Sequence, residues 1–89
     1  DGCWVLSGLL RPDEVQRATE IRLPEDEDYE TVAGLVADRL ARMPEPGDAV
    51  QLPARDRDEA ERDVRLTVLA MDGLRVDRIR LEVLEGSER

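Results

Sequence analysis

One amphipathic segment constrains the fold of this 89-residue chain more than any other part, and it runs from residue 23 to residue 48. Its middle carries apolar side chains at helical spacing, in contrast to the alternation that strands show. The stripe consists of Val32, Val36, Leu40 and Met43, widened by Ala33, Leu35 and Ala37, with Tyr29 beside it if the helix begins early. The order of patterns along the chain therefore predicts a strand and a short helix before this helix, and strands after it.

The ends of this helix are marked by residues with distinct backbone preferences. Thr31 is the better N-cap candidate, because its hydroxyl can accept a free N–H of the first turn, and Asp28 is the alternative. Gly34 costs about 1 kcal/mol in a helix interior, which suggests close approach to a sheet. Pro44 is expected to end the helix, because the residue before a proline avoids the α region. A turn is expected at Pro46-Gly47.

The N-terminal part predicts one strand and one short helix. Residues 4–10 are apolar except for Ser7 and Gly8, so we expect a strand with a kink or turn at Gly8. A helix is expected over residues 12–19, with Pro12 at its first position, burying Val15 and Ala18 at most. Residues 21–23 then lead into an acidic run.

Asp72-Gly73 lies between two apolar runs, residues 64–71 and 74–84, and predicts a hairpin with a two-residue turn. In that register Met71 pairs with Leu74 and Leu69 with Val76, which places these four on the face opposite the main core. The main face then carries Val64, Leu66, Val68, Ala70, Ile79, Leu81 and Val83. Two explanations stay open: a bulge near Asp77-Arg78 changes the phase, or a helix or another subunit covers the tip.

Residues 48–63 combine an alternating stretch with a charged one. Val50 and Leu52 lie on one face of an expected strand over residues 48–52. Residues 53–63 are mostly charged and lack an apolar stripe, so we predict a mobile loop, with a short surface helix over residues 58–62 as the alternative.

These elements together predict an α+β fold of order βααβββ, with a largely antiparallel sheet and two helices on one of its faces. The length fits a single domain over residues 1–89. Because the chain begins at Asp1 without a methionine, we expect it to be excised from a longer protein.

The net charge of −9, from 22 acidic and 13 basic residues, limits the classes of partner. Nucleic acid and anionic membrane surfaces require a basic protein surface, so neither is expected as a partner. No apolar run approaches the ~18 residues of a membrane span and no signal peptide is visible, so direct membrane insertion is not expected.

The residues needed for common catalytic and cofactor sites are missing from the sequence. Histidine is absent, which excludes a Ser/His/Asp triad and leaves Cys3, the only cysteine, without a base to activate it. Glycine-rich phosphate loops are also absent. We therefore predict no enzyme, and no catalytic, cofactor-binding or metal-binding residues.

Two acidic clusters leave metal binding open as an alternative. Glu25, Asp26, Glu27 and Asp28 offer carboxylate oxygens suited to Mg²⁺ or Ca²⁺, although the spacing is not that of an EF-hand. The second cluster contains Asp56, Asp58, Glu59, Glu61 and Asp63 interspersed with arginine, and it is the weaker candidate.

Several segments together resemble the CorC/HlyC transporter-associated domain. They are the initial DGCW, the central LPEDEDYETVAG (residues 23–34), PEPGD (residues 44–48) and the Asp72-Gly73 hairpin, and their order and spacing match over nearly the whole chain. Two positions depart from the family pattern: Cys3 stands where serine is usual, and residues 53–63 lengthen a connection that is normally short. An aromatic that is frequent in the third strand is replaced by aliphatic residues.

The resemblance implies a non-enzymatic module that follows a CBS-domain pair in magnesium and cobalt efflux or hemolysin-like proteins. It implies a fold related to part of flavin-binding domains, without implying that flavin binds. It also implies a cytoplasmic location, tethered to the inner face of the membrane through the parent protein. The expected partners are the CBS and membrane domains of that parent.

Three functions follow as hypotheses. The first is a regulatory or assembly module of a cation-transport protein. The second is a module that senses Mg²⁺ or Ca²⁺ through its acidic loops, and the third is a small-ligand or flavin-like binding domain. We also predict a homodimer with Leu69, Met71, Leu74 and Val76 near its interface, because contiguous exposed apolar patches mark contact sites.

Overall fold

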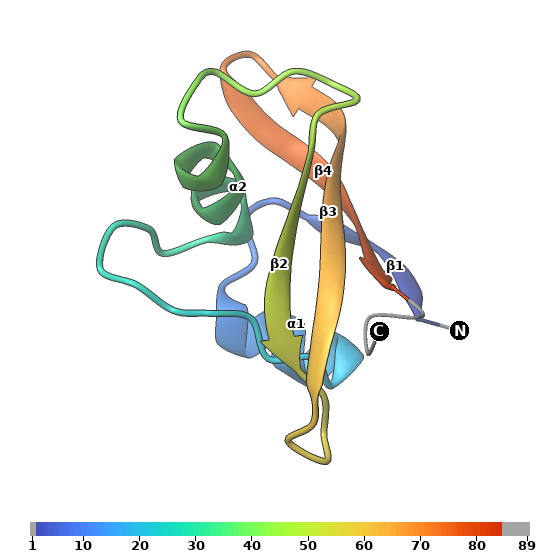
Figure 1. The fold of residues 1–89 in the computed structure, drawn as a ribbon. Helices are drawn as coiled ribbons and strands as arrows, with labels where there is room; N and C mark the ends of the chain where they lie inside the picture. The colour runs from blue at the N-terminus through green and yellow to red at the C-terminus, as the bar shows by residue number, and fades with distance from the viewer. Residues whose placement is uncertain (1, 85–89) are drawn as a thin grey trace.

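The computed structural model describes residues 2–84. Its elements in chain order are β1 (Cys3–Ser7), α1 (Pro12–Thr19), α2 (Val32–Leu40), β2 (Ala49–Arg55), β3 (Glu61–Asp72) and β4 (Arg75–Val83). The four strands form one antiparallel sheet in the order β1-β4-β3-β2. Both helices lie on the same side of this sheet (Figure 1), which confirms the predicted α+β fold and element order.

The core lies between the helices and the sheet face that they cover. Aliphatic side chains fill it, as expected for a chain with no phenylalanine and a single tryptophan. The most completely buried are Val15 from α1, Val32, Leu35 and Val36 from α2, Val64, Leu66 and Val68 from β3, and Ile79 and Leu81 from β4. Burial of such side chains at roughly 1.5–3 kcal/mol each is the main stabilising contribution.

The short helix α1 has the bounds that its sequence predicts. Pro12 occupies the first position, where its missing N–H is not needed, and the Arg11 backbone N–H donates to Glu14 Oε1 at 2.9 Å. Val15 is buried, as expected, but Ala18 is exposed. Thr19 is buried in its place, and its hydroxyl donates to the Val15 carbonyl at 2.8 Å.

Helix α2 starts as predicted and ends earlier. Thr31 is the N-cap, because its hydroxyl oxygen accepts the Gly34 N–H at 3.2 Å. The helix ends at Leu40, and Ala41 adopts the left-handed conformation at φ 59°. The expectation that Pro44 ends the helix was therefore wrong, and Met43 lies in an exposed segment after it.

Gly34 and Gly8 both allow close contacts near α2, but the approach to the sheet that was expected at Gly34 occurs at Gly8. A Cβ on Gly34 would lie 2.9 Å from Tyr29 Cβ, so Gly34 accommodates the loop before the helix and not the sheet. The close approach to the sheet occurs at Gly8, where a Cβ would lie 2.3 Å from the Val76 carbonyl oxygen. Gly8 also lies at the turn after β1, as predicted.

The β3–β4 hairpin forms, but its register differs from that of a two-residue Asp-Gly turn. Asp72 pairs with Arg75 and Met71 with Val76, so Gly73 and Leu74 make the turn. Ala70 then pairs with Arg78, which leaves Asp77 as an extra residue in β4. The bulge expected near Asp77-Arg78 is confirmed.

A second bulge follows on the partner strand. Val68 pairs with Ile79 directly after the Ala70–Arg78 pair, so Leu69 is an extra residue in β3. One residue is thus inserted in each strand, and the apolar alternation returns to its original phase below the bulges. As a result Val76 joins the core, while Ala70, paired with Arg78, leaves the expected core face.

Residues 53–63 do not form one loop. β2 continues through Arg55 and β3 begins at Glu61, and Pro53, Ala54 and Arg55 pair with Asp63, Arg62 and Glu61. The prediction of a loop over this whole stretch was wrong, and so was the alternative helix over residues 58–62. Cross-strand pairing explains the difference, because Ala54 is buried on the core side although its neighbours in sequence are charged.

Candidate functional site

A hollow lies between α2 and the tip of the β3–β4 hairpin, and we call it the tip groove. Its volume is about 530 Å³, within the range of small-molecule and peptide sites. α2 supplies Ala33, Gly34 and Ala37, the segment after it supplies Arg42, Met43 and Pro44, and the hairpin supplies Leu74, Arg75 and Val76. Thr31, the N-cap of α2, and Leu9, from the loop after β1, close one end of the groove.

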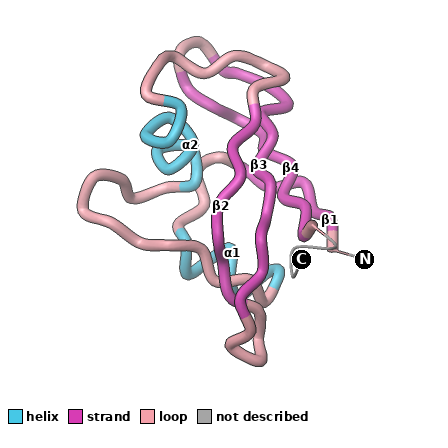
Figure 2. The backbone as a smooth tube through the Cα atoms, viewed as in Figure 1, coloured by secondary structure: helices cyan, strands magenta, loops and turns pink. Residues whose placement is uncertain are grey.

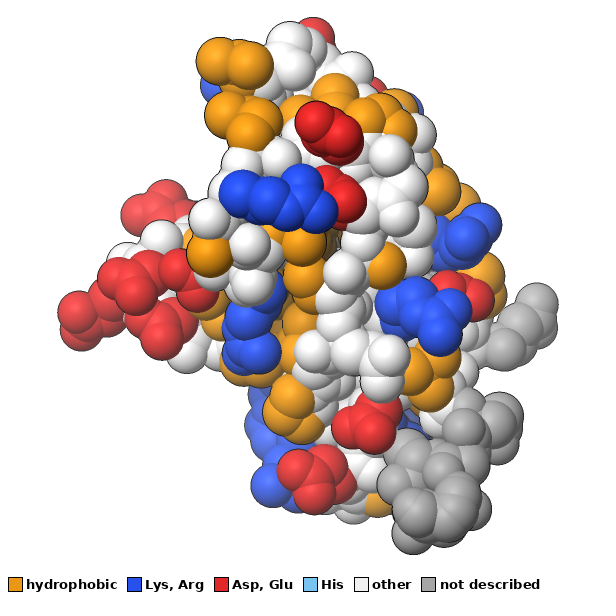
Figure 3. Space-filling view, turned by 45° about the horizontal axis from the view of Figure 1, so that its top comes forward, with side chains coloured by type: hydrophobic (Ala, Val, Ile, Leu, Met, Phe, Trp, Pro, Cys, Tyr) orange, Lys and Arg blue, Asp and Glu red, His pale blue; other side chains and the backbone are white. Residues whose placement is uncertain are grey.

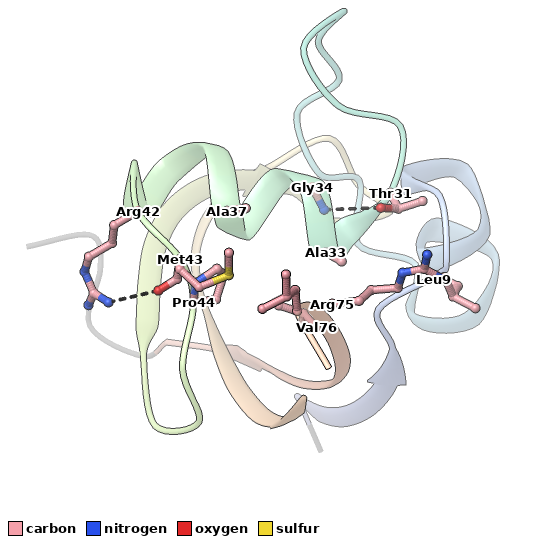
Figure 4. A pocket seen from close by; sticks show the side chains of 11 residues that line it. Leu9, Thr31, Ala33, Gly34, Ala37, Arg42, Met43, Pro44, Arg75 and Val76 are labelled. Carbon is pink, nitrogen blue, oxygen red and sulfur yellow. Dashed lines mark hydrogen bonds between the residues drawn. The ribbon is translucent and has the colours of Figure 1, made fainter. Parts of the chain in front are cut away.

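The elements around the tip groove are fixed by backbone hydrogen bonds. The first helical N–H groups of α2 donate to the loop after β1: Val32 to the Leu10 carbonyl at 2.8 Å and Ala33 to the Gly8 carbonyl at 2.9 Å. These bonds satisfy donors that a helix start otherwise leaves unpaired. They also hold Leu9 beside the helix, at the end of the groove opposite Met43 and Pro44 (Figure 4).

Exposed apolar side chains concentrate at the tip groove. The large hydrophobic residues exposed within residues 2–84 are Val5, Leu9, Met43, Leu69 and Leu74. Leu9, Met43 and Leu74 all line the groove, and Leu74 is 80% exposed. Single exposed hydrophobic residues are ordinary, but several around one hollow mark a contact site.

Two arginines differ in their roles at the groove. The Arg42 guanidinium donates to both carboxylate oxygens of Asp48, at 2.8 and 3.0 Å, and to the Met43 carbonyl at 3.3 Å. The bonds from Arg42 and from the Glu45 N–H lower the pKa of the Asp48 carboxyl. Arg75, in contrast, is exposed and makes no ion pair within the described residues. It is the cation at this rim that is available to a ligand.

The Arg42–Asp48 pair predicts a pH dependence of stability. Because folding lowers the pKa of Asp48, the contribution of the pair is fully present above the unfolded pKa and is lost as the pH falls through the folded pKa. We expect Asp48→Asn to destabilise the protein at neutral pH, with the difference from the unmodified protein disappearing once the pH falls below the lowered pKa of the Asp48 carboxyl. Urea unfolding of both proteins at neutral and acidic pH measures this.

The matched control is Asp38→Asn, since Asp38 is exposed and makes no ion pair in the part of the chain that the structure describes. It is expected to change the free energy of unfolding by less than about 0.5 kcal/mol at neutral pH. A loss for Asp48→Asn that is the same at both pH values would contradict the electrostatic origin.

The four residues predicted at a dimer interface do not share one surface. Val76 is buried and Met71 is half-buried against the core, whereas Leu74 is exposed at the groove. Leu69 protrudes at the bulge and does not line the groove. Their assignment to a single patch was therefore wrong, for the reason that the two bulges change the faces.

The acidic run projects from the body of the protein, on the loop between α1 and α2 (Figure 3). Glu25, Asp26, Glu27 and Asp28 are all exposed. Glu25 and Asp26 line a hollow of about 240 Å³ together with Asp13, Glu30 and Arg11. Within residues 2–84, no three carboxylate or thiol side chains are grouped closely enough to hold a metal ion.

The second acidic cluster is engaged in local structure. The Asp56 carboxylate accepts bonds from the backbone N–H groups of Asp58 and Ala60 and from Arg62 Nε at 2.9 Å. These bonds lower the pKa of the Asp56 carboxyl, with the Arg62 bond as the largest cause. Asp56 therefore closes the β2–β3 turn.

Sequence reasoning missed the tip groove. The sequence placed Met43 in the helical stripe and Leu9 in the apolar run of residues 4–10, and only the fold brings both within reach of Leu74. One signal was present for two of them: Leu9 lies three positions before Pro12, and Met43 lies directly before Pro44. Such residues in loops are candidates for a contact surface.

The sequence pattern of the transporter associated domain, CorC_HlyC, matches residues 1–85. The chain belongs to this family. It is 44% identical over 86 residues to the UPF0053 protein MT1890 of Mycobacterium tuberculosis, with 93% of this chain and 19% of that protein covered. It is 28% identical over 81 residues to YegH of Escherichia coli, with 91% and 14% covered. The chain thus spans less than a fifth of the length of these relatives.

Solved structures of transporter-associated domains have the same fold. The CorC_HlyC domain of a putative Corynebacterium glutamicum hemolysin superposes with a TM-score of 0.79 at 30% identity, covering 93% of this chain and 92% of that one. A CorC_HlyC domain from a Xylella fastidiosa hemolysin, solved in complex with Mg²⁺ and Mn²⁺, has a TM-score of 0.68 at 24% identity, with 96% and 91% covered. These matches confirm the family resemblance and the fold expected from the sequence.

In this transporter-associated domain, α1 and α2 are the helices of residues 2–84, and neither is long and apolar enough to cross a bilayer. Cys3 lies exposed in β1, and there is no histidine in the chain to activate its thiol. The tip groove has mostly apolar walls. Its lining is suited to binding an apolar group and not to acid–base chemistry.

Proposed function

We propose that this transporter-associated domain is a non-enzymatic regulatory or assembly module, and that its tip groove docks onto another part of its parent protein. The observation that carries the proposal is the gathering of exposed Leu9, Met43 and Leu74 around one groove. Burying these side chains against a partner contributes roughly 1.5–3 kcal/mol each before the cost of association. Tethering within one chain lowers that cost by raising the effective concentration.

The chemistry of the rim suggests what the groove takes. The walls are apolar, and Arg75 offers a guanidinium free of ion pairs within the described residues. An apolar segment that carries an Asp or Glu beside its anchor residue matches both features, because Arg binds carboxylates through paired N–H groups. We propose such a segment of the parent protein as the occupant.

The parent is proposed to be a cation-transport protein of the magnesium and cobalt efflux or hemolysin-like kind. The relatives are several times longer than this chain, and the Corynebacterium and Xylella domains come from proteins named as hemolysins. The partners would be CBS and membrane domains of the same protein. The module would lie in the cytoplasm, tethered to the inner face of the membrane.

The docking proposal predicts different effects for two exposed leucines of one hairpin. Leu74→Asp places a charge in the tip groove, so we expect it to weaken binding to the parent protein lacking this domain by at least tenfold. Leu69→Asp is the matched control, because Leu69 is exposed but does not line the groove. Calorimetric titration of the separate domain into the remainder of the parent measures both.

Equal binding by both variants and the unmodified domain would remove the tip groove as the docking surface. An absence of binding by the unmodified domain, at concentrations up to the millimolar effective concentration of a short tether, would remove the docking proposal itself.

Cation sensing is the second candidate. The hollow beside Tyr29 is lined by Asp13, Glu25, Asp26 and Glu30 together with Arg11, and carboxylates are the oxygen ligands that Mg²⁺ and Ca²⁺ prefer. Because these carboxylates are not grouped closely enough in the described residues to hold an ion, binding would require the acidic loop to move. The Xylella domain, which shares this fold, was solved with Mg²⁺ and Mn²⁺. Calorimetry with each ion at millimolar concentration tests this candidate. Binding is expected to release or absorb heat, and Glu25→Gln is expected to diminish that heat. An absence of heat would remove cation sensing and leave the docking role.

A small-ligand role for the tip groove is the third candidate, supported by its volume of about 530 Å³. A ligand that binds the folded state raises its melting temperature. A thermal-shift panel of flavins and nucleotides that produces no shift would remove this candidate.

A further inference from the structure

The edge strands of the sheet are β1 and β2 (Figure 2), and they differ in how their outward backbone groups are protected. At the β2 edge, Arg22 and Arg55 exchange backbone hydrogen bonds of 2.8 and 3.1 Å, so Arg55 presents its N–H and C=O outward. Alternation along the strand makes Pro53 and Gln51 outward-facing too. Pro53 has no N–H to offer, so a proline and a covering segment both protect this edge against strand addition.

The β1 edge has neither protection. The strand reads CWVLS, with no proline and no charged residue, although 39% of the chain is charged. The Val83 N–H donates to the Gly2 carbonyl at 2.8 Å, and the Gly8 N–H donates to the Asp77 carbonyl at 2.9 Å. The even-numbered residues therefore bond to β4, and Cys3 and Val5 direct their backbone groups outward. Within residues 2–84, no segment pairs with this outer side.

We propose that the β1 edge pairs with β1 of a second copy of this chain, antiparallel, about a two-fold axis at Val5. Two copies of one strand can pair this way because an outward-facing residue at the centre bonds to its own equivalent. Cys3 then lies opposite Ser7 of the second copy. The two four-stranded sheets become one continuous sheet. This surface is separate from the tip groove, so the inference is independent of the docking role.

Side chains support this register. Val5 is 61% exposed on the sheet face that the helices leave open, and in the dimer it lies beside its equivalent. Trp4, half-buried at the margin of the core, lies opposite Leu6 of the second copy on the other face. Cross-strand pairs of aromatic and aliphatic residues stabilise antiparallel sheets.

Charge opposes this contact less than the total of −9 per copy suggests. β1 is uncharged, and the nearest charged residues of the sheet, Arg78, Arg80 and Glu82, lie on β4. Three strand spacings, ~14 Å, separate the two β4 strands of the dimer. This exceeds the screening length of ~10 Å at 0.1 M salt. The contact is small, so we expect a weak dimer that forms at high protein concentration.

Sedimentation of Val5→Pro beside Val5→Thr tests the pairing. Proline removes an N–H that points away from β4, so it eliminates the bond to the second copy and leaves the β1–β4 ladder intact. Threonine has nearly the same shape and keeps that N–H. We expect the unmodified chain and Val5→Thr to form dimers, and Val5→Pro to associate at least tenfold more weakly.

Cross-linking gives a second measurement that does not depend on proline being tolerated. Ser7→Cys places a new thiol opposite Cys3 of the second copy, so treatment with diamide is expected to produce a covalent dimer. The unmodified chain is the control. In this register the two Cys3 residues of the dimer are offset by four positions along the strands. This separates them by ~13 Å, which is too far for a disulfide.

Either of two results overturns the proposal. The first is that the unmodified chain sediments as a monomer at the highest concentration tested. The β1 edge would then be available to another segment of a longer protein. The second is a dimer whose association Val5→Pro leaves unchanged. Cross-linking of the unmodified chain as efficiently as Ser7→Cys would overturn the Val5-centred register.

Discussion

Replacing Gly8 with alanine is expected to lower the free energy of unfolding by about 3 kcal/mol or more. The added Cβ would lie 2.3 Å from the Val76 carbonyl oxygen, 3.0 Å from the Val76 carbonyl carbon and 3.2 Å from Ala33 Cβ. The backbone cannot easily move away, because the Gly8 N–H donates to Asp77 and its carbonyl accepts from Ala33, both at 2.9 Å. Urea unfolding followed by circular dichroism measures the loss.

Gly73→Ala is the control for this substitution. A Cβ on Gly73 meets nothing within 4 Å, and only the positive φ of 65° opposes it. Left-handed backbone costs roughly 1–2 kcal/mol for a residue other than glycine. Equal losses at the two glycines would show that the contact between the Gly8 turn and β4 is looser than the structure has it.

Replacing Val76 with aspartate is expected to unfold the domain, or to destabilise it by more than about 4 kcal/mol. Val76 is 3% exposed within the core cluster, so its replacement would bury a carboxylate among aliphatic side chains beneath the tip groove. Domains of this size have free energies of unfolding of about 5–15 kcal/mol, so the loss is a large part of the total. Thermal unfolding at neutral pH gives the result.

Leu69→Asp and Leu74→Asp complete this experiment, because the three positions lie in one hairpin and differ in burial. We expect both to fold, with losses below about 1 kcal/mol. In the register of a two-residue Asp-Gly turn, Leu69 and Val76 would share a face and respond alike. Unfolding of Leu69→Asp with survival of Val76→Asp would contradict the two bulges.

The elements that the sequence predicted well are those with local causes. Pro12 and the acidic residues after it favour a helix start, and Thr31 can cap α2 without help from distant residues. The aliphatic stripe of Val32, Leu35 and Val36 requires only one apolar surface to pack on. The antiparallel hairpin likewise follows from its turn residues and flanking apolar runs.

The features that the sequence did not predict depend on contacts between distant segments. Pro44 is compatible with a helix that ends at Met43. In the structure the helix ends at Leu40, and the segment after it contains Arg42, which pairs with Asp48, and Met43, which lines the tip groove. Ala54 reads as part of a charged loop until β3 pairs with it and the core covers it.

The bulges and the tip groove show the same limitation. Asp77 could be suspected as a bulge from the hairpin register, whereas its partner at Leu69 follows only from the pairing of Val68 with Ile79. The tip groove requires three segments to meet, and no periodicity within any one of them marks the others. Its predicted counterpart, a patch containing Val76, failed because the face of Val76 depends on those bulges.

The pairing of β1 with β4 also determines when this domain can fold. Cys3 pairs with Glu82 and Ser7 with Arg78, so β1 can pair within the sheet only after β4 has been synthesised. Contacts between such distant residues slow folding, because the entropy of closing the intervening chain is lost before they form. During synthesis, α1, α2 and the β2–β3 hairpin can emerge from the ribosome without a partner for β1. We expect the native state to appear in one late, cooperative step once β4 has left the exit tunnel.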